Sequence, residues 1–126
     1  MFDRPQHLSP NLREKRRYVA FKINCNKPLQ EMDVNNAIWN SALNFLGDLG
    51  AAKASLFVLK GIYTPENKIG MVRCSHTAVE HVRTALALVT RVGEEPVIIE
   101  VLGISGTIKA AKRKYLGERI LSSFEK

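Results

Sequence analysis

The chain has 126 residues, of which 45% are hydrophobic and 25% charged, and its formal net charge is +7 at pH 7. This length suits one compact domain, and the composition excludes a disordered tail because it supplies enough apolar residues to bury a core. No apolar run is long enough to cross a bilayer and no secretory signal pattern opens the chain, so we expect a cytoplasmic protein without a membrane partner.

The N-terminal part of the chain predicts a strand and then a helix. Residues 17–24 alternate between apolar and polar side chains, which is typical of a strand with one buried face. Residues 32–49 carry apolar side chains at steps of three and four, as in an amphipathic helix, and Gly50 is expected to end it. The predicted buried stripe of this helix is Val34, Ile38, Ala42, Phe45 and Leu49.

The middle of the chain predicts a hairpin and a second helix. Residues 54–63 and 69–74 are the two hairpin strands, and a turn that contains a proline separates them. Thr77 and Glu80 have the spacing of a capping box, which predicts that Thr77 starts a helix. We expect this helix to end near Gly93.

A last strand, residues 97–102, and a last helix that opens near residues 105–107 complete the pattern. The order strand, helix, strand, strand, helix, strand is the split βαβ arrangement. It predicts an α+β, ferredoxin-like (RRM-like) βαββαβ sandwich with an extra C-terminal helix. The four-stranded antiparallel sheet should have the order fourth, first, third, second, with two helices on one face. Residues 1–11 should form a loose arm, and residues 12–126 a single domain.

The excess positive charge lies at the two ends of the chain: three of the seven charges fall in residues 1–17 and four in residues 103–126. Strands one and four should be antiparallel neighbours, so the two basic segments should meet in one patch. Arginine and lysine suit phosphate oxygens, so we predict that the patch binds nucleic acid, the alternative being that charged ends are merely solvated. The basic residues of the predicted patch are Arg13, Lys15, Arg16, Arg17, Lys109, Lys112, Arg113 and Lys114.

Aromatic and apolar side chains outside the predicted core suggest one further surface. An RNA-recognition motif stacks bases on aromatic residues of strands one and three. Here residues 69–74 hold no aromatic side chain and Tyr18 is the only candidate on either strand, so base stacking on the sheet is not expected.

A second apolar stripe on the first helix (Trp39, Leu43 and Leu46) is either a wide core face or a surface for a protein partner.

Groups for catalysis or metal binding are sparse. His7, His76 and His81 have no obvious Ser, Cys or carboxylate constellation, so neither a catalytic residue nor a metal site is predicted. Cys25 and Cys74 do not have metal-ligand spacing, and we expect them to lie at opposite edges of the sheet as free thiols.

Four segments, taken in order, resemble a known family. They are Leu12-Arg13-x-Lys15-x-Arg17-Tyr18, Gly70-Met71-Val72-Arg73-Cys74, Ala85-Leu86-Ala87-Leu88-Val89 and Gly103-Ile104-Ser105-Gly106-Thr107-Ile108-Lys109. In this spacing, over residues 12–116, the chain is similar to the small ferredoxin-like protein subunit of archaeal and eukaryotic ribonuclease P, a family called protein component 2 in archaea.

The resemblance implies a subunit of ribonuclease P, the ribonucleoprotein that removes the 5′ leader of precursor tRNA. In that family the RNA subunit carries the chemistry with Mg²⁺, so the chain itself is expected to be non-catalytic and to bind no cofactor. The implied partners are the ribonuclease P RNA, precursor tRNA through the holoenzyme, and a larger TIM-barrel-like protein subunit, with two copies of each protein able to associate in a heterotetramer. The RNA-facing role carries over to the matching residues Arg13, Lys15, Arg17, Arg73 and Lys109.

Two other functions fit a sandwich of this kind. A small-molecule-sensing regulatory module would bind its ligand at a subunit interface and would not need a basic patch. An acylphosphatase-like hydrolase would use the glycine-rich turn at 103–107, but it needs an arginine and an asparagine placed on one anion, and no convincing pair is found. The acidic turn at Glu94 and Glu95 departs from the family's pattern, so RNA contact by that turn is not expected.

Overall fold

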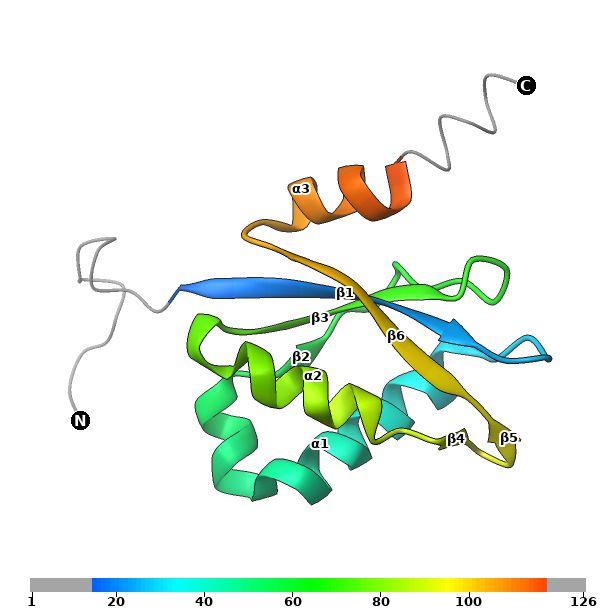
Figure 1. Ribbon diagram of the computed structural model, residues 1–126, viewed down its shortest axis with the longest axis horizontal. Coiled ribbons are helices and arrows are strands. Elements are labelled where there is room, and N and C mark those ends of the chain that lie inside the picture. Colours follow the sequence, from blue (N-terminus) through cyan, green and yellow to red (C-terminus); the bar gives the residue numbers. More distant parts are fainter. Residues whose placement is uncertain (1–14, 118–126) are drawn as a thin grey trace.

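The computed structural model describes residues 15–117, which form a four-stranded sheet with helices on both faces (Figure 1). The expected arm at residues 1–11 lies outside the described residues. The elements in chain order are β1 (Arg16–Asn24), α1 (Glu31–Ala54), β2 (Phe57–Val58), β3 (Ile69–Ser75), the 3-10 turn η3 (His76–Ala78), α2 (Val79–Ala87), β4 (Arg91–Val92), β5 (Glu95–Pro96), β6 (Ile98–Ser105), α3 (Ile108–Lys112) and the π-helical turn η4 (Arg113–Gly117).

The sheet has the predicted order and direction. Its strands lie in the order β2-β3-β1-β6, where β6 is the predicted fourth strand, and each neighbouring pair is antiparallel. Helices α1 and α2 cover one face, and α3 lies on the other (Figure 1). The α+β, ferredoxin-like sandwich with an extra C-terminal helix is therefore confirmed. A small two-stranded sheet, β4-β5, was not predicted.

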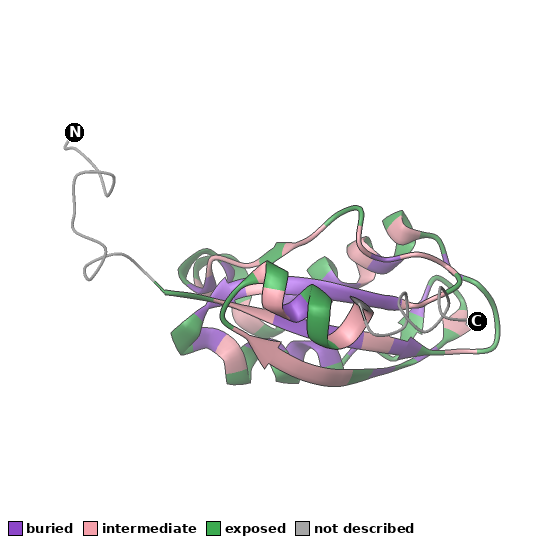
Figure 2. Cartoon of the chain, turned by 90° about the horizontal axis from the view of Figure 1, so that it is seen from above, coloured by how far each residue is buried: buried purple, intermediate pink, exposed green. Residues whose placement is uncertain are grey.

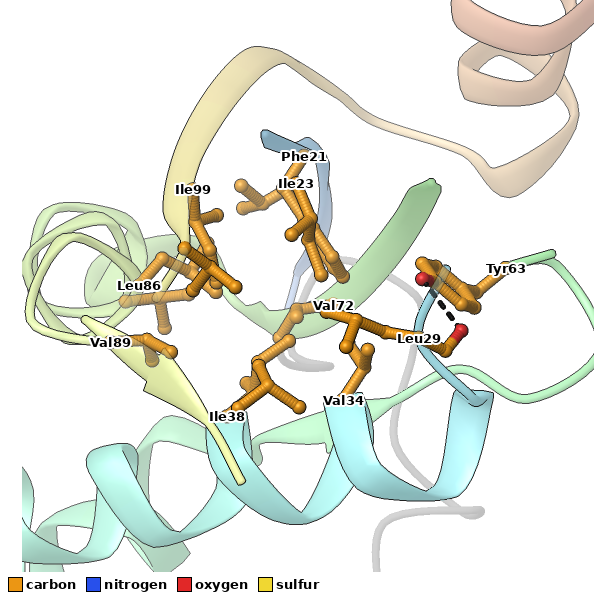
Figure 3. Close-up of a cluster of buried hydrophobic side chains, with 14 of the residues drawn as sticks. Phe21, Ile23, Leu29, Val34, Ile38, Tyr63, Val72, Leu86, Val89 and Ile99 are labelled. Carbon is orange, nitrogen blue, oxygen red and sulfur yellow. Dashed lines mark hydrogen bonds between the residues drawn. The ribbon is translucent and has the colours of Figure 1, made fainter. Parts of the chain in front are cut away.

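The main core lies between the sheet and the two helices α1 and α2. Alternate residues of β1, namely Val19, Phe21 and Ile23, are buried on this face, as their spacing predicts. They meet side chains from α1, α2, β3 and β6 (Figure 3). Burying an apolar side chain of this size stabilises the fold by about 1.5–3 kcal/mol. At one end of the core the Tyr63 hydroxyl donates a hydrogen bond to the Leu29 carbonyl at 3.0 Å.

A second, smaller core lies on the opposite face, which we call the α3 face. Ala20 of β1, Met71 of β3 and Ala111 of α3 are buried together there, and Leu102 packs against them. Figure 2 shows α3 and the sheet from above, with buried residues along the strands. The Tyr115 ring lies directly against Gly103, where a side chain would clash with it. The glycine thus leaves the space that lets the C-terminal helix sit on the sheet.

The first helix differs from its predicted course. Gly47 interrupts it with φ 76° and ψ 170°, and the helix then continues to Ala54 instead of ending at Gly50. The predicted buried stripe holds up to Ala42 and fails at Phe45, which is 42% exposed and lies before the break. The break at Gly47 shifts the helical phase for the residues after it. Leu49 is 70% exposed, and Ala51 and Ala54 are buried in its place.

Three smaller predictions at element ends were also wrong. Of the strand expected at 54–63, the structure forms only the two residues of β2. Its expected first residue, Ala54, belongs to α1. Thr77 does not cap α2: the Ser75 hydroxyl instead accepts a hydrogen bond from the Thr77 backbone N–H, at 3.4 Å, and caps η3. Finally, α2 ends at Ala87, before the expected boundary at Gly93.

The two cysteines are free, as predicted. Cys74 is buried in β3 opposite Arg17, near the start of β1, whereas Cys25 follows the other end of β1. Among the described residues, none of the helices combines the length and the apolarity that crossing a membrane requires.

Candidate nucleic-acid interface

The pairing of β1 with β6 brings the two basic segments of the chain to one end of the sheet. Tyr18 lies opposite Ser105, so Arg16 and Arg17 lie beside the end of β6. From there the chain leads directly into α3, whose second residue is Lys109. Figure 1 shows the start of β1 and the start of α3 at the same end of the molecule. The predicted convergence of the two segments is therefore present, although Arg13 lies outside the described residues.

The cations at the start of β1 do not share one face of the sheet. Arg17 pairs with Cys74, which belongs to the main core, so Arg17 points to the side of α1 and α2. Arg16 pairs with Ser75 and lies on the α3 face, because side chains alternate along a strand. The Arg17 Nη1 donates to the Arg16 carbonyl at 2.9 Å. The carbonyl of Lys15 accepts a hydrogen bond from the His76 N–H at 2.9 Å, which ties this end of β1 to the end of β3.

Arg73 lies on the α3 face between two aromatic residues. In the register of the sheet it pairs with Tyr18 on one side and with Phe57 on the other. Its guanidinium carbon lies 4.8 Å from the centre of the Phe57 ring, within the range of a cation–π interaction. Its Nε is shielded from solvent and has no hydrogen-bond partner within residues 15–117.

The cations of α3 and η4 extend the basic surface across the α3 face. Buried Ala111 holds the helix to the sheet, and the four exposed cations are Lys109, Lys112, Arg113 and Lys114. Lys112 and Arg113 line a hollow of about 460 Å³ beside the loop at residues 61–67. They therefore point away from the start of β1. The predicted compact patch is instead a band along the α3 face, which we call the basic band: Arg16, Arg73, Lys109, Lys112 and Arg113.

Within residues 15–117, no carboxylate forms an ion pair with the cations of the basic band. In the part of the chain that the structure describes, one ion pair forms between side chains, Arg83 with Glu80 at 3.9 Å, and it lies on α2. Glu100 lies on the α3 face, but in the strand register it stands opposite Lys22, at the far end of β1 from Arg16. The cations of the band are thus available to an external anion.

The predicted apolar stripe on α1 is partly covered. Trp39 is 39% exposed and lies beside β2, where it lines a hollow with Leu56 and Phe57. Leu43 is half-buried. Leu46 is half-buried too and faces the start of α2. Contact between this stripe and a protein partner remains a prediction.

The described residues hold no group of three or more His, Cys, Asp or Glu side chains that could bind a metal ion. Two buried groups have altered acidity. Burial raises the pKa of the Cys74 thiol to about 11, so it stays protonated at neutral pH. Burial also raises the pKa of Tyr63, with smaller contributions from Cys25 and Glu66.

Sequence reasoning did not single out Phe57 as a site residue. It lies in the segment expected to form a long apolar strand, where an aromatic residue is ordinary core material. The strand is two residues long, however, and leaves Phe57 44% exposed on the α3 face. Only the sheet register, which sets Phe57 opposite Arg73, reveals that it lies beside the basic band.

Comparison with known proteins gives matches over nearly the whole chain. The model of the Rpp14/Pop5 family matches residues 17–116. The protein named ribonuclease P protein component 2 from Thermococcus gammatolerans is 42% identical over 118 residues, covering 94% of this chain and 97% of the relative. Its namesakes from Pyrococcus furiosus and Methanosarcina mazei are 41% and 38% identical, over 94% of this chain and 97% and 99% of their own lengths.

A solved structure gives an independent match to the fold. A chain in the cryo-EM structure of yeast ribonuclease MRP superposes with a TM-score of 0.58, covering 89% of this chain and 93% of that chain. The sequence identity is 12%, so this likeness concerns the fold alone.

Proposed function

Because this chain belongs to the Rpp14/Pop5 family, we propose that it is a protein subunit of ribonuclease P, the ribonucleoprotein that removes the 5′ leader of precursor tRNA. The relatives' shared name, ribonuclease P protein component 2, supports this assignment at 38–43% identity. Family membership does not favour the alternative of a small-molecule-sensing regulatory module.

The observation that carries the RNA-binding part of the proposal is the β1–β6 register, which joins the two basic segments at one end of the sheet. A band of cations that have no carboxylate partners among the described residues attracts the phosphates of RNA and releases their counterions. In a large folded RNA, phosphates crowd together and repel one another. Cations on a rigid sheet and helix lower this repulsion, so the RNA folds at a lower Mg²⁺ concentration.

In this proposal the chain takes no part in bond cleavage. The RNA subunit carries the chemistry with its own Mg²⁺, and the chain binds no cofactor. Its partners are the ribonuclease P RNA, precursor tRNA through the holoenzyme, and a larger TIM-barrel-like protein subunit, with two copies of each protein in a heterotetramer. Exposed Lys15, half-buried Arg17 on β1 and exposed Lys114 on η4 add to the RNA contact.

The proposal predicts a specific change in the salt dependence of RNA binding. Replacing Lys109, Lys112 and Arg113 with alanine removes three phosphate contacts, so the slope of log K against log salt flattens by roughly two units. Electrophoretic retardation of ribonuclease P RNA at rising salt measures this slope.

A matched variant controls for the loss of net charge. Lys27, Lys53 and Arg91 are exposed cations that lie away from the basic band. Replacing these three with alanine removes the same charge and should leave the slope close to that of the unaltered chain. Equal slopes for both triple variants would rule out the basic band as the phosphate-binding surface.

A further inference from the structure

One row of residues crosses all four strands on the α3 face. The register sets Ser105 of β6 opposite Tyr18 of β1, Tyr18 opposite Arg73 of β3, and Arg73 opposite Phe57 of β2. Directly opposed residues project from the same face of a sheet. Two residues further along β1, the pair Ala20–Met71 lies in the core under α3, so the row belongs to the α3 face.

The last helix covers only the neighbouring part of this face. Ala111 packs on Ala20 and Met71 and buries them, whereas the neighbouring row is partly exposed to solvent. Phe57 is 44% exposed, and Tyr18 and Arg73 are half-buried. In Figure 1 the start of β1 extends past α3, so that at this end no described helix lies over the α3 face.

The chemistry of the row suits a ligand that is flat and apolar on one side and anionic on another. The Arg73 guanidinium lies over the Phe57 ring, and among the described residues Arg73 forms no ion pair. Arg16, exposed in the adjacent row, adds a second cation. An unpaired nucleotide has both features, because every base offers a π-face and every phosphate a negative charge.

We infer that this row binds unpaired RNA bases, with a base stacked on Phe57 and the adjoining phosphates held by Arg73 and Arg16. The inference deepens the proposed function and rests on it, since it names the part of the RNA that the site takes. Tyr18 extends the stacking surface on the other side of Arg73. The aromatic partner missing from β3 is thus supplied by β2, the edge strand.

The test uses the full chain with a short unstructured RNA strand and a blunt RNA duplex of the same length. The Phe57→Leu variant keeps an apolar side chain but loses the ring, so affinity for the single strand should fall roughly tenfold. Affinity for the duplex should stay within twofold, because paired bases do not reach the ring. The salt slope should not change, because no phosphate contact is lost.

Two variants make this comparison sharp. Phe57→Tyr keeps the ring and should bind the single strand as the unaltered chain does, even if both changes at this position lower thermal stability. Phe45→Leu alters an aromatic residue of nearly equal exposure, 42%, on the helical layer, and should leave RNA binding unchanged.

Equal binding of the single strand by the Phe57→Leu and Phe45→Leu variants would overturn the inference. It would also be overturned if Phe57→Leu lowered affinity for the duplex as much as affinity for the single strand. A third contrary result would be unchanged RNA binding together with weaker binding to the larger protein subunit, which would make the row a protein interface. None of these results touches the proposed function, which fails instead if the triple alanine variant keeps its salt slope and leader cleavage proceeds equally well without the chain.

Discussion

At the scale of single residues, burial decides what each polar group can do. Cys74 is fully enclosed by the main core, so it behaves as a small apolar side chain and cannot act as a thiolate at neutral pH. Arg73 shows the opposite case: it is half-buried with its guanidinium over the Phe57 ring, and it forms no ion pair among the described residues. The sequence could place Arg73 among basic residues, but only the register shows which ring it contacts.

The raised pKa of Cys74 predicts a stability change at alkaline pH. The thiol pKa is 9.0 when exposed and about 11 in the fold, so the unfolded chain loses this proton first. The free energy of unfolding should therefore be constant for this group below pH 9 and fall by about 2–3 kcal/mol as the pH rises to 11. Tyr63, whose pKa is also raised, adds a fall in the same direction.

Urea denaturation at a series of pH values measures this effect. The control is Cys74→Ala, which removes the thiol and should lose most of the fall between pH 9 and 11. If both proteins lose the same stability over this range, the buried thiol is not its source.

At the scale of elements, the largest difference between the predicted and the observed structure is the break in α1 at Gly47. Helical periodicity predicted the first half of α1, and Val34, Ile38 and Ala42 are buried as expected. Phe45 is exposed although it continues the same steps. After Gly47, whose φ is positive, the phase of the helix shifts, which an unbroken pattern of three- and four-residue steps cannot reveal. The two-residue strands β4 and β5 were missed because such short segments carry no periodicity.

The kink at Gly47 predicts a position-specific cost for alanine. With φ 76°, a residue that has a Cβ is strained there, so Gly47→Ala should lower the free energy of unfolding by about 1 kcal/mol. Gly106→Ala is the matched control, because a Cβ at Gly106 meets open space and the φ of that residue is not positive. Thermal unfolding of the two variants compares them directly. A gain in stability for Gly47→Ala would mean that α1 runs straight through this position.

At the scale of the whole molecule, the topology was predictable and the shape of the binding surface was only partly so. Four strands and two helices in a fixed order leave few ways to assemble, and the observed sheet order is the expected one. The same topology correctly brought Arg17 and the start of α3 to one end. The sequence could not show that Lys112 and Arg113 face the loop at 61–67, because that depends on the direction in which α3 crosses the sheet.

The central claim is that this chain supports the RNA of ribonuclease P, and reconstituted leader cleavage tests it most directly. Cleavage of precursor tRNA would be followed over a Mg²⁺ titration with the complete set of subunits, without this chain, and with the variant that lacks Lys109, Lys112 and Arg113. We predict that leaving out the chain raises the Mg²⁺ concentration needed for half-maximal cleavage, and that the triple variant restores only part of the loss. The same Mg²⁺ requirement and rate in all three mixtures would contradict the account.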